Sequence, residues 1–215
     1  MTDSDVPASA RPLVAVLDYG IGNLRSAQKA LERQGADARL TADLDLARRA
    51  DGVVLPGVGA FGRCAQAIRD AGLHDVVADS VAAGVPFLGI CIGMQLLYEE
   101  SEEDPGAAGL GVLDGAVRRL PGKVKVPQMQ WNQLERPRPS GLWAGLADPA
   151  WVYFNHSYAV VEPDPARVIG VCDYGGAVTA AVEFGPRQWA VQFHPEKSGA
   201  AGLHVLSTFV AACRA

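Results

Sequence analysis

Residues 86–100 read PFLGICIGMQLLYEE. The apolar run 86–90 is typical of a strand that is buried on both faces of a parallel sheet. The glycines on either side of Cys91 predict a sharp turn after this strand, and residues 94–100 predict a helix that follows at once. A cysteine on such a turn is held above the edge of the sheet, so the sequence predicts an α/β fold with Cys91 at the carboxyl ends of its strands.

Similar units precede this one in the chain. Asn23 is expected to cap a helix that Gly35 ends, and strand and helix patterns alternate around it. The other expected helices cover residues 43–49, 63–71 and 74–83, and the expected strands cover 13–17, 51–55 and, more weakly, 38–41. This alternation indicates an open, mostly parallel central sheet with helices on both faces.

The second half of the chain has a different pattern. From about residue 109 the segments are shorter, richer in β-branched and aromatic residues, and separated by proline and glycine, so we expect antiparallel additions to the sheet. The expected strands cover residues 111–120, 151–154, 167–172, 178–184 and 188–193, and a terminal helix is expected at 200–212. The chain has no internal repeat, which predicts one domain at 13–215 behind a disordered tail at 1–12.

The composition limits the classes of protein to which the chain can belong. Of its 215 residues 49% are hydrophobic, and 19 Lys and Arg against 24 Asp and Glu give a net charge of −5. Because basic residues are neither in excess nor clustered, nucleic acid and membranes are not expected partners, and no apolar run is long enough to span a bilayer. The irregular spacing of the four cysteines argues against disulfides and zinc, which favours a cytoplasmic location.

Two residues near the C-terminus give Cys91 a chemical context. His194 and Glu196 follow the strand expected at 188–193, and residues two apart in an extended chain project to the same side, so Glu196 can orient the His194 ring. Pro195 favours extended geometry at His194. A cysteine, a histidine and a carboxylate form the general arrangement that activates a thiol toward an acyl carbon. Each residue alone has a structural alternative, and only the combination favours catalysis.

The sequence Pro56-Gly57-Val58-Gly59 follows another expected central strand. Its peptide N–H groups are free of ladder pairing, so they can point at a bound carbonyl oxygen together with the amide of Ile92. A plain turn is the structural alternative. A nucleotide site is disfavoured because neither GxxxxGK[ST] nor GxGxxG is present.

Six strings together resemble the class I (triad) glutamine amidotransferases. They are DYGIGNLRS (18–26), LPGVGAFG (55–62), GICIGMQLL (89–97), WNQL (131–134), YFNHSY (153–158) and QFHPEKSG (192–199). They cover the chain nearly end to end and occur in the family's order. Within the class, DYGxGN, PGVGAFG and NHSY are similar to the glutaminase subunits of imidazole glycerol phosphate synthase, which act in histidine biosynthesis.

The resemblance implies a role for each matching residue. Cys91 would attack the side-chain amide of L-glutamine, His194 would move the proton and Glu196 would orient His194. The residues implied to bind glutamine or its oxyanion are Gly57, Val58, Gly59, Ile92, Gln95, His156, Ser157 and Tyr158. Those implied at a partner interface are Trp131, Asn132 and Lys197. The implied partner is a separate (β/α)8-barrel cyclase subunit that receives the ammonia, and no metal or organic cofactor is implied.

One departure from the family pattern concerns the expected interface. The family has His-Met-Gly-Trp-Asn where this chain has Gln128-Met129-Gln130-Trp131-Asn132. The sequence therefore leaves open whether the partner docks at this place. Two alternatives to a glutaminase subunit of imidazole glycerol phosphate synthase stay open. One is a triad amidotransferase subunit that serves another synthase, and the other is a catalytically silent module that regulates a partner.

Overall fold

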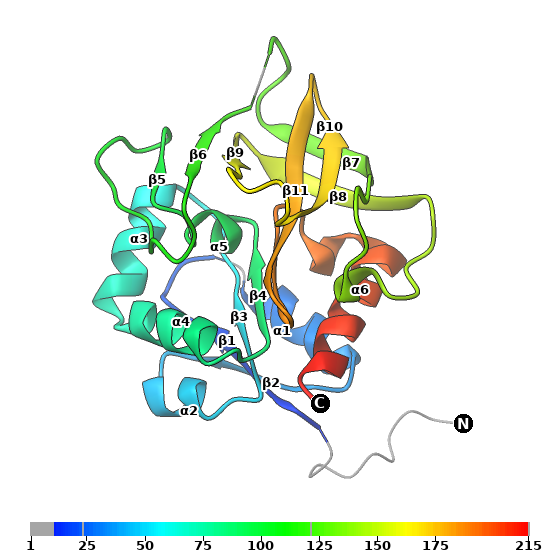
Figure 1. Ribbon diagram of the computed structural model, residues 1–215. Helices are drawn as coiled ribbons and strands as arrows, with labels where there is room; N and C mark the ends of the chain where they lie inside the picture. The colour runs from blue at the N-terminus through cyan, green and yellow to red at the C-terminus, as the bar shows by residue number, and fades with distance from the viewer. Residues whose placement is uncertain (1–10, 23, 121, 215) are drawn as a thin grey trace.

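The computed structural model describes residues 11–22, 24–120 and 122–214. A seven-stranded sheet lies between two layers of helices, and shorter strands form a second lobe above it (Figure 1). The predicted cap Asn23 and residues 1–10 of the predicted tail lie outside the described residues. No described helix has both the length and the apolar character needed to cross a membrane.

The central sheet has the strand order β10-β11-β12-β4-β3-β1-β2. Five of its strands are parallel and two at one edge are antiparallel, as expected for an α/β fold with antiparallel additions. The parallel strands are β1 (Leu13–Leu17), β2 (Asp37–Thr41), β3 (Gly52–Leu55), β4 (Phe87–Ile90) and β12 (Gln188–Val191). The antiparallel strands are β10 (Val168–Asp173) and β11 (Ala177–Gly185). The strand expected at 188–193 was expected among the antiparallel additions; β12 is antiparallel to β11 but parallel to β4, so it extends the parallel centre of the sheet.

The helices cover both faces of this sheet. Figure 1 shows α3 and α4 on one side and α1 and α6 on the other. Their bounds are α1 (Leu24–Arg33), α2 (Leu44–Arg48), α3 (Phe61–Asp70), α4 (Leu73–Ala82) and α6 (Gly199–Ala212). The buried positions of α1 recur at three and four residues, which is the spacing that predicted the helix. After α1 the chain turns at Gly35, whose φ of 85° favours glycine.

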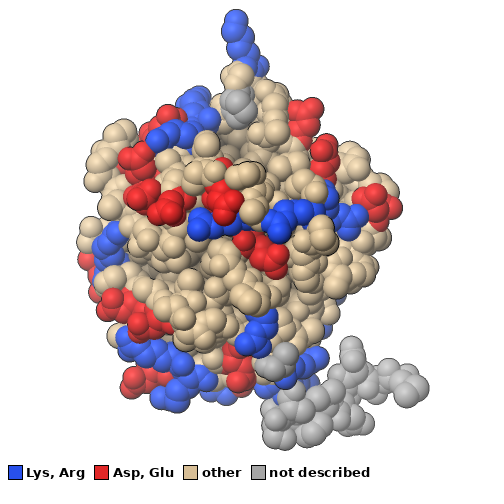
Figure 2. All heavy atoms as spheres, viewed as in Figure 1, with Lys and Arg blue, Asp and Glu red and all other residues tan. Residues whose placement is uncertain are grey.

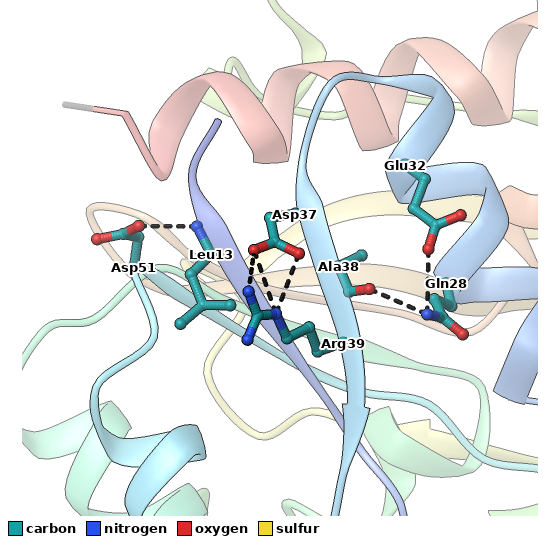
Figure 3. Close-up of polar contacts among 7 residues, drawn as sticks. All are labelled: Leu13, Gln28, Glu32, Asp37, Ala38, Arg39 and Asp51. Atoms are coloured by element: carbon teal, nitrogen blue, oxygen red, sulfur yellow. Dashed lines mark hydrogen bonds and ion pairs between the residues drawn. The ribbon is translucent and has the colours of Figure 1, made fainter. Parts of the chain in front are cut away.

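Strand β2 forms one edge of the sheet, and polar side chains tie it to its surroundings (Figure 3). The Gln28 amide of α1 donates a hydrogen bond of 3.0 Å to the Ala38 carbonyl. Arg39 and Asp37 form an ion pair of 2.6 Å along the strand itself. Charged side chains on an edge strand disfavour pairing with a second chain, so they keep this edge single.

The helix expected at 94–100 was wrong in length. Helix α5 covers only Ile92–Gln95, and the chain then enters β5 (Glu100–Ser101). The reason lies in tertiary hydrogen bonds: the carbonyls of Leu96 and Leu97 accept from the backbone of residues 110–113 and so leave the helical pattern. Hydrogen bonds to a distant segment have here overridden local helix propensity.

Two smaller sheets form the second lobe. One contains β5, β6 (Ala116–Arg119) and β9 (Tyr158–Val161), and the other contains β7 (Gln128–Leu134) and β8 (Ala150–His156). The strand expected at 111–120 is therefore shorter, and β7 and β9 were not expected. β7 buries only its two end residues, so it lacks the alternation that marks a strand in sequence. Short 3-10 helices, η2 (Gly141–Trp143) and η3 (Pro195–Lys197), complete the elements.

Gly93 makes the closest contact between α5 and the sheet and gives a test of the packing. Gly93→Ala is expected to destabilise the fold by about 3 kcal/mol, because a Cβ here would overlap the Leu55 carbonyl at the end of β3. The free energy of unfolding in urea measures the effect. Gly141→Ala is the control, since its Cβ would meet only the Trp189 ring at an ordinary 3.6 Å. Equal losses in the two variants would contradict this packing.

Candidate active site

Cys91 occupies the sharp turn that the sequence predicts after β4. Its φ of 55° and ψ of −110° make it the one non-glycine residue with positive φ among the described residues. The Cys91 N–H donates to the Val191 carbonyl at 2.8 Å, which fixes the turn to the end of β12. Such a conformation costs about 1–3 kcal/mol in a non-glycine residue. The turn therefore holds the thiol in a strained position at the carboxyl ends of two neighbouring strands.

His194 and Glu196 lie side by side, three and five residues beyond the end of β12. His194 Nδ1 and Glu196 Oε1 are 2.8 Å apart, so the expected contact is confirmed. The expected extended geometry was wrong, because residues Pro195–Lys197 form the 3-10 helix η3. Only His194 itself is extended, as the following proline favours. A tight turn rather than a strand brings the carboxylate behind the imidazole.

The backbone around His194 is held by strand β8. The His194 N–H donates to the Tyr153 carbonyl at 3.0 Å. The Ser198 hydroxyl donates to the His194 carbonyl at 2.6 Å and accepts from the Tyr153 N–H at 2.9 Å. Three hydrogen bonds thus fix the turn that carries His194 and Glu196 against β8.

Cys91 and His194 meet because β4 and β12 are adjacent parallel strands. Burial lowers the pKa of His194, but hydrogen bonds to Cys91 and Glu196 outweigh burial and raise the pKa from 6.5 to about 9. An imidazolium at neutral pH favours the thiolate of a neighbouring cysteine. The three residues therefore form a connected set that can activate a thiol.

Gln192 adds a second polar neighbour to the thiol. Its amide nitrogen donates to Cys91 Sγ at 3.7 Å, and its amide oxygen accepts from Gln95 Nε2 at 2.9 Å. Sequence reasoning missed Gln192, although it begins the string that contains His194. The available signal was its position two residues before His194, within the buried strand expected at 188–193.

A cleft of about 280 Å³ opens beside Cys91 and His194. Seven of the residues implied to bind glutamine line it: Val58, Gly59, Ile92, Gln95, His156, Ser157 and Tyr158. Gly57 does not line this cleft and borders a small neighbouring pocket instead. The remaining lining residues, to which the sequence analysis gave no role, are Glu103, Pro127 and Asn155. Glu103 lies in an acidic run, EESEED (99–104), and no local feature of the sequence distinguishes it from its neighbours.

Two residues that line the cleft carry acceptors without a partner. Gln95 Oε1 and His156 Nε2 are buried, and neither has a hydrogen-bond partner among the described residues. Burial lowers the pKa of His156 to about 4, so the ring is neutral at pH 7. Because Nδ1 lies 2.8 Å from the Tyr158 carbonyl, it carries the proton, and Nε2 presents its lone pair. With the Glu103 carboxylate, these atoms suit a ligand rich in N–H donors.

The residues implied at an interface lie outside the cleft. Lys197 is exposed on η3, and Trp131 is 48% exposed on β7 with its ring 6.1 Å from that of Tyr153. Asn132 is engaged within the chain, since its side-chain amide donates to the Asp173 carbonyl. Met129 and Trp151 add exposed apolar area to the same two-stranded sheet.

The two departures at β7 differ in their surroundings. Gln128 is buried opposite His156 and contacts Cys172 Sγ at 3.7 Å. Gln130 is exposed, so strand β7 accommodates its side chain without rearrangement. On the face shown in Figure 2, basic and acidic side chains alternate and neither sign forms a continuous area. Within the described ranges, no three His, Cys, Asp or Glu residues are grouped as a metal site would require.

Comparisons with known proteins give consistent results. The family model for class-I glutamine amidotransferases matches residues 15–213. A Bacillus cereus protein described as imidazole glycerol phosphate synthase subunit HisH is 45% identical over 197 residues, which cover 92% of this chain and 93% of that protein. A Deinococcus radiodurans protein with the same description is 47% identical over 208 residues and 96% of each chain. A crystal structure described as a glutamine amidotransferase shares the fold, with a TM-score of 0.73, 23% identity, and coverage of 93% of this chain and 98% of that one.

The four thiols should differ sharply in reactivity. Iodoacetamide at neutral pH is expected to alkylate Cys91 at least about tenfold faster than Cys64, Cys172 or Cys213, because thiolate is the reactive form. Burial raises the pKa values of those three to about 11, 11 and 12, which leaves them protonated. Mass spectrometry of time points gives the rates, and His194→Gln should slow labelling of Cys91 alone. Equal labelling of all four thiols would exclude an activated Cys91.

The neutral state of His156 predicts a pH effect on stability. The pKa of His156 is about 4 in the fold and 6.5 in its absence, so both states are neutral above pH 6.5. As pH falls from 6.5 toward 4, His156 binds a proton in the unfolded chain but not in the folded chain, so stability is lost. The free energy of unfolding should therefore fall more between pH 7 and pH 5 in the wild type than in His156→Asn. An identical fall in both would show that His156 does not resist protonation.

Proposed function

The chain belongs to the class-I glutamine amidotransferases, in the group of imidazole glycerol phosphate synthase HisH subunits, and from this we propose that it is the glutaminase of that synthase. In this proposal it hydrolyses glutamine to glutamate and passes the ammonia to a synthase subunit for histidine biosynthesis. The observation that carries the proposal is the connected set of Cys91, His194 and Glu196 beside a cleft whose lining includes two unpartnered acceptors. Residues 13–215 would form the single amidotransferase domain.

The first half of the reaction forms a thioester. Cys91 Sγ attacks the side-chain amide carbon of glutamine, and the carbonyl oxygen becomes an oxyanion. Val58 and Ile92 line the cleft together with Cys91, and their amides would donate to this oxygen. His194 gives its proton to the amide nitrogen, the C–N bond breaks, and ammonia leaves.

The second half restores the enzyme. His194, now neutral, takes a proton from a water molecule that attacks the thioester carbon. The C–S bond breaks, the thiolate of Cys91 returns and glutamate is released. Glu196 keeps the His194 ring in one orientation through both halves and stabilises its protonated form.

The acceptors of the cleft account for the choice of glutamine. The α-ammonium group offers three N–H donors, which the Glu103 carboxylate and Gln95 Oε1 would accept. The lone pair on His156 Nε2 would accept a further N–H of the substrate. Ser157 and Tyr158 complete the wall that faces Gln95, since Gln95 Nε2 donates to the Tyr158 carbonyl. Glutamine would thereby satisfy Gln95 Oε1 and His156 Nε2, two buried acceptors that have no other partner in the described residues.

The partner would be a separate (β/α)8-barrel cyclase subunit, forming a heterodimer. The surface of this chain that contacts the partner would include Trp131 and Asn132 on the exposed sheet β7–β8 and Lys197 beside Glu196. This surface lies next to the turn that holds His194, because the same strand β8 binds that turn. We place the reaction in the cytoplasm, where thiols stay reduced, because the mechanism requires a free Cys91.

Separating the two half-reactions of the complex tests the proposal. Cys91→Ala should reduce glutamine-dependent synthesis by the assembled enzyme at least about a thousandfold, as expected when a nucleophile is removed. Synthesis from added ammonium salt should be retained, because the partner performs that step. Glutamate release is measured for the chain alone and for the chain mixed with the barrel subunit and its nucleotide.

Two comparisons make the result decisive. Cys213→Ala also removes a buried thiol but lies at the end of α6, away from the cleft, so it should keep both activities. Loss of the ammonium-dependent reaction in Cys91→Ala would assign Cys91 a structural role. Glutamate release that ignores the barrel would keep the glutaminase but move it to another synthase.

A further inference from the structure

Two loops meet at the same end of the sheet, and the proposed reaction uses only one of them. The loop 18–22 follows β1, and the loop 56–59 follows its neighbour β3. They are in contact, since Val58 Cγ2 lies 3.0 Å from the position of a Cβ on Gly22. The first loop contains DYGIG (18–22), which has no part in the steps described above.

Tyr19 anchors the second loop, residues 56–59, through its side chain. Its side chain is buried, and its hydroxyl donates to the Pro56 carbonyl at 2.8 Å. Burial raises the pKa of Tyr19 far above its usual range, so the hydroxyl keeps its proton and remains a donor. A Cβ on Gly57 would overlap this hydroxyl, so glycine is required where the loop passes over Tyr19. The Pro56 carbonyl is thereby fixed in direction.

Cys64 holds the next carbonyl but one. Its Sγ lies 3.6 Å from the Val58 carbonyl, with the thiol as donor. Burial raises the pKa of Cys64 to about 11, so this thiol also keeps its proton. The peptide that joins Gly57 to Val58 therefore lies between two anchored carbonyls. Its N–H belongs to Val58, which borders the cleft together with Cys91.

We propose that Tyr19 is a positioning residue for the oxyanion site: its hydroxyl anchors Pro56 so that the Val58 amide faces the carbonyl oxygen of the substrate. Ile92, the source of the second amide, packs against the same glycine, with its Cβ 3.1 Å from the position of a Cβ on Gly57 that the Tyr19 hydroxyl also approaches. Tyr19 thus sets the spacing between the two donors without touching the substrate. The inference rests on the proposed glutaminase function.

Tyr19→Phe in the full chain tests the role, because it removes the hydroxyl and keeps the ring. Loss of an oxyanion donor costs about 10²–10³ in kcat, and a donor that is only loosened should cost less, about tenfold. KM for glutamine should change less than about twofold, because Glu103 and Gln95 are untouched. Alkylation of Cys91 by iodoacetamide should keep its rate, because this displacement forms no oxyanion. Amide hydrogen exchange should accelerate in residues 56–60 and stay unchanged in 91–95.

Tyr174→Phe is the matched control. Its hydroxyl donates to a backbone carbonyl as well, that of Lys125 at 2.6 Å, but at an exposed site outside the cleft. This variant should keep kcat, the alkylation rate and exchange in 56–60. A structural effect of losing any such hydroxyl would appear in both variants as a fall in the melting temperature with kcat unchanged.

The remaining outcomes separate this proposal from the proposed function. An unchanged kcat in Tyr19→Phe, a change in KM alone, or an equal fall in kcat and in Cys91 alkylation would each overturn the positioning role. If the wild type releases no glutamate with or without the barrel, the glutaminase proposal fails instead. Hydrogen exchange then decides alone, and unchanged exchange at 56–60 would show that Tyr19 does not anchor the loop.

Discussion

Parallel pairing between β4 and β12 is the interaction on which the site depends. The register places Ile90 beside Val191, so the two chains leave the sheet at the same level. Cys91 follows one strand directly, and His194 follows the other after two buried residues. These strands lie about 100 residues apart in sequence, and the hydrogen bond from the Cys91 N–H to the Val191 carbonyl joins them at the residue that carries the thiol. Without this pairing, neither turn alone would bring the His194 imidazole to the Cys91 thiol.

Around this pair the fold combines rigid and unsatisfied groups. The backbone of His194 is held through Tyr153 and Ser198, and the loop beside Cys91 is held through Tyr19. By contrast, Gln95 and His156 each keep a buried acceptor without a partner in the described residues. An unsatisfied buried polar atom costs about 1–3 kcal/mol, which a ligand with matching donors recovers. A fixed backbone geometry and unsatisfied acceptors together favour the binding of a polar ligand.

The sequence predicted those parts of the fold whose local pattern agrees with their tertiary surroundings. The apolar runs that became β1, β3 and β4 and the helical spacing in α1 are such parts. It failed where distant contacts decide: hydrogen bonds from residues 110–113 end α5 early, and the exposed face of β7 hides its strand character. In the cleft, Cys91 and His194 were visible from their motifs. Glu103 was not, because only the fold distinguishes it from neighbouring surface acids.

The positive φ of Cys91 has a consequence for how this site can change over evolutionary time. Glycine adopts this backbone conformation without strain, whereas cysteine bears a cost of about 1–3 kcal/mol at position 91. In the proposed mechanism, folding and turnover therefore favour different residues at position 91. A lineage released from the need for turnover gains stability by accepting glycine there, and only continued selection for the reaction retains the thiol.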